Sequence, residues 1–144
     1  MKTTVRKALL ADYRPIARIL LEQAQNQELL SLEAKIKKGL QLAQGAHHPM
    51  TAVNEAGRVL GYALWHLVPR LDIGGPEAYL AEIRVEKVAQ GQGVGKALLA
   101  AVQAQAQAQG CVRICLGITG ETGFFEKQGF KRQNNLGLTL ELRA

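Results

Sequence analysis

Three alternate glycines stand in the stretch Gln90-Gly91-Gln92-Gly93-Val94-Gly95-Lys96. A run with strand character precedes it at 79–85, and a run with apolar residues at helical spacing follows it from Ala97 to Val102. Glycine permits backbone angles that other residues resist, and it keeps side chains away from the amides. The first amides of a helix lack partners within the helix and lie at its positive end, so this turn is typical of a phosphate or pyrophosphate site.

Two better-known glycine motifs do not fit this stretch. A Walker A loop requires Gly at the position of Gln90 and Ser or Thr at that of Ala97. A dinucleotide-binding fingerprint that starts at Gly91 requires a small residue where Lys96 stands. The remaining pattern, Q-x-x-G-x-G, is compatible with an anion site and also with a plain glycine-rich helix start.

A second motif lies downstream, in Gly123-Phe124-Phe125-Glu126-Lys127-Gln128-Gly129-Phe130. The first pattern resembles the acetyl-CoA pyrophosphate motif of the GNAT superfamily of N-acetyltransferases, R/Q-x-x-G-x-G/A. The second resembles the short helix F-Y-E-K-x-G-F of the same superfamily. Both motifs occur in the expected order around one helix and one strand, and with the N-terminal pattern the resemblance covers almost the whole chain.

The N-terminal part opens with a strand-like run from Thr3 to Leu9, and Asp12 follows as a candidate helix cap. A second helix is expected from about Ser31 to the Gly39 or Gly45 region. GNAT domains open with a strand and two helices, which commonly form one wall of the acceptor-amine site. Polar residues that could line this wall are Gln23, Gln25, Asn26, Gln27 and Glu28.

The middle of the chain predicts a hairpin of strands 50–54 and 59–68, joined at 55–58. Trp65 and His66 should then point to opposite faces, with Trp65 in the core. We expect His47-His48-Pro49 to form a loop, and we assign no catalytic or ligand role to either histidine. A mobile loop is expected at 69–78.

The C-terminal part predicts a strand at 111–118, a short helix at 124–128 and a final hairpin of 130–133 with 136–142 across Asn134-Asn135. The resemblance implies one α/β domain, 1–144. Its mixed, mostly antiparallel sheet would have about six to seven strands, with the central strands splayed around the cofactor and about four helices on both faces.

Composition limits the remaining classes. The 144 residues suit one domain with a real core, and no run resembles a signal peptide or membrane span, so a soluble, cytoplasmic protein is expected. Cys111 and Cys115 would lie roughly 13 Å apart on a strand, too far for a disulfide, and no zinc-ligand spacing is present. The net charge of +6 favours an anionic ligand such as coenzyme A, or simply solubility. Nucleic acid is not favoured, since no aromatic residues interleave the basic ones.

Acetyl transfer to an amine needs a base, because an alkyl amine with a pKa of about 10.4 is protonated at neutral pH. Freeing its lone pair costs roughly 4 to 5 kcal/mol at pH 7. By resemblance, Glu82 is the candidate base, on the strand that leads to the glycine turn. The alternative is a strand-surface residue paired with Arg84 on the same face.

The resemblance also implies the cofactor contacts. Backbone groups of Ile83 and Val85 would hold the pantetheine arm, and the amides of 90–96 would hold the pyrophosphate. Many relatives carry a Tyr acid at the position of Phe125, which cannot donate a proton, so solvent or Tyr79 is the candidate substitute. Phe125 could flank the CoA thiol, while Phe124 and Phe130 would anchor the helix in the core.

The predicted function is therefore direct, acetyl-CoA-dependent N-acetylation of a small-molecule, amino-acid or protein amine, without a metal or a covalent enzyme intermediate. A catalytically weak or inactive acyl-CoA-binding regulatory domain is the alternative, motivated by Phe125. A nucleic-acid-binding module is third. Similar proteins are commonly dimers, so a homodimer is an open expectation.

Overall fold

The structure, a computed structural model, describes residues 2–23, 28–117, 123–133 and 138–142. At its centre is a five-stranded sheet in the order β1-β2-β3-β4-β5. Neighbouring strands run antiparallel except β4 and β5, which are parallel. The strands are β1 (Thr4–Lys7), β2 (His47–Val53), β3 (Val59–Val68), β4 (Glu77–Val85) and β5 (Arg113–Leu116).

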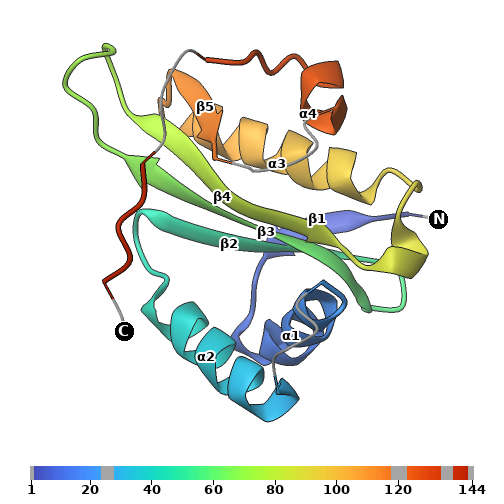
Figure 1. The fold of residues 1–144 in the computed structure, drawn as a ribbon. Coiled ribbons are helices and arrows are strands. Elements are labelled where there is room, and N and C mark those ends of the chain that lie inside the picture. Colours follow the sequence, from blue (N-terminus) through green and yellow to red (C-terminus); the bar gives the residue numbers. More distant parts are fainter. Residues whose placement is uncertain (1, 24–27, 118–122, 134–137, 143–144) are drawn as a thin grey trace.

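Helices cover both faces of this sheet (Figure 1). α1 (Tyr13–Leu21) and α2 (Leu29–Leu42) lie on one face, and α3 (Val94–Ala108) and α4 (Gly123–Lys127) lie on the other. Two short 3-10 helices, η1 (Leu10–Asp12) and η2 (Lys87–Ala89), lead into α1 and into the glycine turn. The predicted mixed α/β architecture with helices on both faces is confirmed.

Each helix layer encloses its own apolar core. The larger core lies between α3 and the sheet and includes Trp65, Leu80, Leu98, Leu99 and Val102. The smaller core lies under α1 and α2 and includes Ile16, Ile19, Val59 and Tyr62. The sheet therefore presents a different set of side chains to each layer, and the site depends on this division.

The predicted six to seven strands were too many for the residues described, which contain five. In the predicted final hairpin, 130–133 and 138–142 form no strand, and Asn134, Asn135 and Leu136 lie outside the described residues. Leu138, Leu140 and Leu142 alternate as strand residues do, yet they are 81 to 92% exposed. An alternating pattern becomes a strand only when a neighbouring strand supplies hydrogen bonds, so periodicity alone overestimated the sheet.

The two parallel strands, β4 and β5, pair over a short distance only. β5 pairs with Glu77 to Leu80 of β4, and no described residue of β5 pairs with 81–85. β5 is also shorter than the predicted 111–118, of which Ile118 lies outside the described residues. One edge of β4 is thus left without a strand partner, within the described chain, where β4 approaches the glycine turn.

His47-His48-Pro49 begins β2 and is not the predicted loop. Proline is tolerated there because of its position in the ladder. The Pro49 carbonyl accepts the Ala8 N–H at 2.9 Å, just beyond β1. Because the carbonyl and the nitrogen of one strand residue point to the same neighbouring strand, the proline nitrogen also faces away from β3. The absent N–H costs no bond to β3, and the strand can include a proline.

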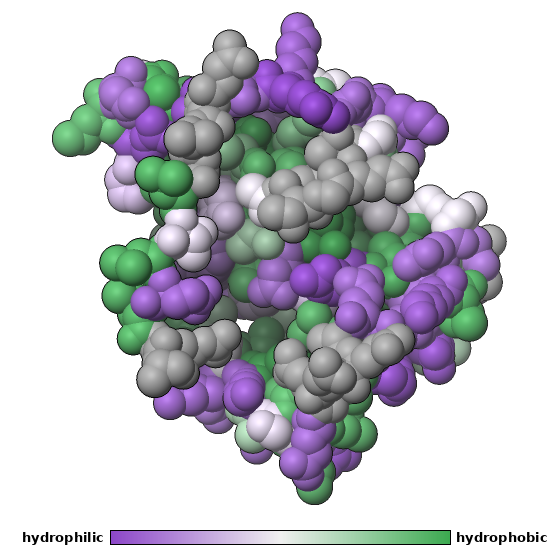
Figure 2. Space-filling model, viewed as in Figure 1, coloured by the Kyte–Doolittle hydropathy of each residue, from purple (hydrophilic) through white to green (hydrophobic). Residues whose placement is uncertain are grey.

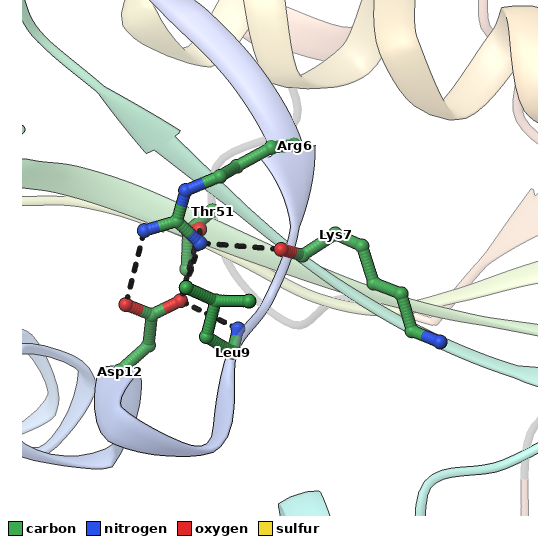
Figure 3. A network of polar contacts seen from close by, with 5 residues as sticks. All are labelled: Arg6, Lys7, Leu9, Asp12 and Thr51. Carbon is green, nitrogen blue, oxygen red and sulfur yellow. Dashed lines mark hydrogen bonds and ion pairs between the residues drawn. The ribbon is translucent and has the colours of Figure 1, made fainter.

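A polar network fixes the entry of the chain into α1 (Figure 3). Arg6 Nη1 donates to Asp12 Oδ2 at 2.7 Å and to Thr51 Oγ1 at 2.9 Å. The Leu9 N–H donates to the same carboxylate at 2.7 Å. Asp12 is the N-cap residue of α1, as predicted, but its carboxylate accepts hydrogen bonds from Arg6 and the Leu9 N–H and makes no side-chain cap bond to α1. The network joins β1, η1 and β2 beneath α1.

Candidate active site

The glycine turn joins β4 to α3 through η2. Gly91 and Gly93 have φ of +78° and +84°, the left-handed region that favours glycine, and Gly93 is the residue before the first turn of α3. The Ala97 N–H bonds to the Gly93 carbonyl at 3.0 Å. The amides of 94–96 precede this bond and so lie at the positive end of the helix. A Cβ added at Gly91 or Gly93 would meet nothing within 4 Å, so the turn borders open space.

Side chains hold the turn in place from behind. Gln90 Nε2 donates to the Val85 carbonyl at 3.2 Å, and Gln92 Nε2 donates to the Val88 carbonyl at 3.3 Å. Both glutamines thus fold back onto the chain that leads into the turn. The Lys87 N–H donates to the Glu22 carboxylate at 3.1 Å, which ties the turn to the end of α1. These bonds favour a preformed turn, in which the Gln90 N–H also donates to the Lys87 carbonyl at 3.3 Å.

The aromatic ring beside the turn belongs to Phe124, not to Phe125. A Cβ added at Gly95 would lie 3.5 Å from Phe124 Cζ and 3.8 Å from Val85 Cγ2. Phe124 is 39% exposed and Phe125 only 8% exposed. The prediction that Phe124 anchors the helix in the core was wrong, since Phe125 has that position and packs on Phe130 with ring centroids 5.7 Å apart.

The end of α4 explains this choice. The Phe130 N–H bonds to the Phe125 carbonyl and the Gly129 N–H to the Glu126 carbonyl, with Gly129 at φ +97°. This is a Schellman ending, in which the residue after the glycine commonly contacts the residue five positions earlier. The spacing Phe125 to Phe130 around Gly129 was therefore a sequence signal for the buried ring.

A β-bulge in β4 places Leu80 and Glu82 on opposite faces of the sheet, although they are two residues apart. Leu64 pairs with Glu82 and Trp65 with Leu80, so Ala81 is the extra residue. Leu80 packs in the α3 core, and after the bulge Ile83 and Val85 pack against the same core. Glu82 turns to the α1–α2 face, where the Tyr62 hydroxyl donates to Glu82 Oε1 at 2.8 Å.

Tyr62 orients the Glu82 carboxylate. Its burial, the negative charge of Glu82 and their hydrogen bond all raise the pKa of Tyr62 above its ordinary value, so the hydroxyl remains a donor. Arg84, the predicted alternative partner of Glu82, donates from Nη1 to Gln23 Oε1 at 2.9 Å. Glu82 is half-buried and held by one buried hydroxyl, a suitable setting for a base.

Glu82 also lines a pocket of about 310 Å³ between the sheet and helices α1 and α2. Apolar side chains form most of its walls, among them Ile16, Leu20, Ile36, Leu40 and Leu64. Hydrophobic side chains are visible in the hollow between the sheet and the two helices in Figure 2. Of the residues suggested for the acceptor wall, Gln25, Asn26 and Gln27 lie outside the described residues.

Two histidines meet at this pocket, and the sequence reasoning missed them. His47 and His66 both line it, with their Nδ1 atoms 2.8 Å apart. Burial and the nearby His47 lower the pKa of His66, while Glu82 acts in the opposite direction. Trp65 points to the α3 core and His66 to the pocket, as the strand alternation predicted. The hairpin register was the missed signal, because it pairs residue 50 with 63 and therefore 47 with 66.

Tyr79, the candidate acid, lies on β4 before the bulge. It pairs with His66 on β3 and Cys115 on β5, and a Cβ added at Gly117 would lie 3.0 Å from its hydroxyl. The hydroxyl is therefore directed toward the end of β5, where the two parallel strands cease to pair. Its role as an acid stays a prediction.

The sequence matches the acetyltransferase (GNAT) family over residues 8–130. The chain belongs to this family. The GNAT match includes α1, α2, the glycine turn, α3 and α4, and so contains every site residue named above. A search of curated proteins finds no match to the chain.

Solved structures share the GNAT fold of this chain. A transcriptional regulator from Bacillus halodurans is 21% identical with a TM-score of 0.88, covering 98% of this chain and 100% of that one. A ribosomal-protein-alanine N-acetyltransferase from Brucella melitensis is 17% identical with a TM-score of 0.79, covering 98% and 100%. An aminoglycoside N-acetyltransferase in complex with CoA is 18% identical with a TM-score of 0.75, covering 99% and 96%. At these identities the likeness shows the fold alone.

The described residues form neither a metal centre nor a membrane-spanning helix. No cluster of three or more His, Cys, Asp or Glu side chains there could hold a metal ion. Within the same residues, no helix is both long and apolar enough to cross a membrane. Cys111 and Cys115 are free thiols, as their spacing predicted.

Proposed function

We propose that this GNAT protein is an acetyl-CoA-dependent N-acetyltransferase that moves an acetyl group directly from the thioester to an amine. The proposal treats residues 1–144 as one acetyltransferase domain. Its main support, beyond the family, is the position of Glu82. This carboxylate lines an apolar pocket and stands on the strand that leads, through η2, to the glycine turn.

The residues present fit the coenzyme. The turn borders open space, and its helix amides lie at the positive end of α3. The side chains of Gln90 and Gln92 bond to the Val85 and Val88 carbonyls. We assign the pyrophosphate to the amides of 91–96, because the Gln90 N–H of the expected 90–96 set already donates to the Lys87 carbonyl at 3.3 Å. We assign the pantetheine arm to backbone groups of Ile83 and to the N–H of Val85, whose carbonyl accepts Gln90 Nε2, along the edge of β4 that β5 leaves unpaired. When bound, acetyl-CoA supplies the activated acyl group.

The side chains on the other face of β4 would handle the proton. Glu82 takes a proton from the acceptor ammonium, while the Tyr62 hydroxyl holds the carboxylate in position. The freed nitrogen lone pair forms the new C–N bond as the C–S bond breaks, and the electron pair of that bond leaves on sulfur. Solvent or Tyr79 then protonates the thiolate.

Two measurements test this function together. Calorimetry should detect binding of both CoA and acetyl-CoA, and a scan of amines with acetyl-CoA should release free thiol at a rate proportional to enzyme. A thermal shift with CoA provides an independent check of binding. The proposal fails if neither form of the coenzyme binds and no amine releases thiol.

The second candidate is a non-catalytic acyl-CoA-binding regulatory domain. Phe125 favours it, because this residue occupies the position of the usual Tyr acid and its ring is buried in the core. Acetyl-CoA binding without turnover over a broad amine panel would support this candidate over the enzyme.

Gly93→Ala should weaken CoA binding about tenfold or more. A non-glycine residue in the left-handed region costs roughly 1 to 2 kcal/mol, and the turn relieves this strain by changing the direction of its amides. Calorimetry measures the change. Gly57→Ala is the matched control, since Gly57 has φ of +82° and equally open surroundings in the β2–β3 turn. Gly57→Ala should lower the free energy of unfolding by a similar amount and leave CoA affinity unchanged. If the two variants bound CoA with equal affinity, the assignment of the pyrophosphate to the glycine turn would be contradicted.

A further inference from the structure

The chemistry of the pocket beside Glu82 restricts which amine could enter it. Its helix side is built from aliphatic side chains of α1 and α2, and its sheet side adds Met50 and Leu64. The polar side chains among its lining residues are Tyr62, Glu82, His47 and His66. No lysine or arginine belongs to the lining that the structure describes, although the chain carries a net charge of +6.

Those polar groups are largely engaged with one another. The Tyr62 hydroxyl donates to Glu82, and His47 bonds to His66 through their Nδ1 atoms. That bond needs one ring as donor and the other as acceptor, so the accepting ring carries no proton on its Nδ1. Glu82 is therefore the single carboxylate in the described lining that could meet a cationic group.

This arrangement disfavours strongly polar acceptors. A phosphate would find no lysine or arginine in the described lining, and a second ammonium would find no second carboxylate there. Hydroxyl or peptide groups would lose their bonds to water against leucine and isoleucine side chains, at a substantial cost in binding free energy. An apolar body in the same place gains by leaving water.

We infer that the acceptor is a primary monoamine with an alkyl or aryl-alkyl body, its nitrogen at Glu82 and its body against α1 and α2. This inference rests on the proposed function. A volume of about 310 Å³ suits a small molecule, at the lower end of the range for ligand pockets.

An acceptor panel tests the class directly. With the wild-type protein, phenethylamine and hexylamine should give kcat/KM values at least about 10-fold above those of ethanolamine, the gain expected from burying one large apolar group. Spermidine and a short peptide with N-terminal alanine serve as polar comparators. Preference for any of these three polar amines over phenethylamine would overturn the inference while leaving N-acetyltransfer intact.

Gly39→Leu tests whether this pocket holds the amine body. Gly39 lies in α2, lines the pocket, and has nothing within 4 Å of an added Cβ, so a leucine there extends into space. Leucine also favours helix over glycine, so folding should not suffer. We expect KM for phenethylamine to rise at least about 10-fold, as a lost apolar contact of this size implies, and KM for ethylamine to change little.

The matched control is Lys38→Leu, which adds the same side chain one position earlier in α2, at an exposed residue outside the lining. It should leave both KM values unchanged. An unchanged KM for phenethylamine in Gly39→Leu would place the amine elsewhere and refute the inference. If no amine is acetylated although CoA binds, the proposed function fails first. Calorimetry then compares the binding of phenethylamine and ethanolamine to the CoA-saturated protein. If phenethylamine binds no more tightly than ethanolamine, the inference that the pocket takes an apolar amine is refuted.

Discussion

Glu82→Gln should lower kcat/KM for acetyl transfer by about 10²- to 10³-fold at pH 7, with partial recovery as the pH rises. Glutamine keeps the shape of the side chain and can still accept the Tyr62 hydroxyl bond, but it cannot take a proton from the acceptor. At higher pH a growing share of the amine is already neutral, so the lost base matters less. A pH profile of kcat/KM for both proteins measures the effect.

Two further variants isolate this role. Glu55→Gln removes an exposed carboxylate in the β2–β3 turn and should leave the profile unchanged. Tyr62→Phe keeps the buried ring but removes the hydroxyl that positions Glu82, so a smaller loss in kcat is expected without a change in CoA affinity. If Glu82→Gln keeps full activity across the pH range, Glu82 is a surface carboxylate of β4 and another group acts as the base.

Asp12→Asn should destabilise the fold by about 2 to 4 kcal/mol. Removing one partner of a buried ion pair leaves the other without a counter-charge, at about 3 to 5 kcal/mol for fully buried pairs. The Asp12 side chain is 8% exposed but that of Arg6 is 33% exposed, so water recovers part of the loss. Urea unfolding at pH 7 measures the difference.

The same pair makes stability depend on pH. Burial alone would raise the pKa of Asp12, but hydrogen bonds from Arg6 and the Leu9 N–H, with the charge of Arg6, hold it below its ordinary value. A carboxyl with a depressed folded-state pKa stabilises above its unfolded pKa of about 3.9, and this contribution is lost as pH falls through the folded pKa. The wild-type protein should therefore lose more stability than Asp12→Asn between pH 7 and pH 3.

Asp72→Asn is the control for charge alone. Asp72 also pairs with an arginine, Arg70, at 2.8 Å, but its side chain is 65% exposed. Exposed ion pairs contribute little, so this variant should unfold nearly as the wild-type protein does at pH 7. Equal losses in Asp12→Asn and Asp72→Asn would contradict the structural role of the Asp12 network.

The sequence predicted those parts of the site whose conformation is decided locally. Glycines at 91 and 93 have the positive φ that the turn requires, and the apolar spacing after them does begin a long helix. Strand alternation placed Trp65 and His66 on opposite faces, because successive side chains of a strand must diverge. Glu82 was found through the family resemblance, not through its spacing.

Features that depend on pairing between distant segments were missed. The bulge at Ala81 decides which face Glu82 joins, and no local pattern marks it. His47 and His66 meet only because β2 and β3 share a register. Similarly, the leucines at 138–142 have strand periodicity, but periodicity supplies no neighbouring strand.

The bulge in β4 decides which changes of length this member of the GNAT family could tolerate. The strand changes its alternation once, at Ala81. Even-numbered residues (Ala78, Leu80) face α3 before this point, and odd-numbered residues (Ile83, Val85) face α3 after it. Deleting that single alanine would remove the bulge and give β4 one uninterrupted alternation, in which Leu80 and Ile83 still face α3 and Glu82 still faces α1 and α2. Deleting a residue after the bulge, such as Ile83, would instead turn the positions that follow it to the opposite faces. The exposed turn at 54–58 has no such alternation to preserve.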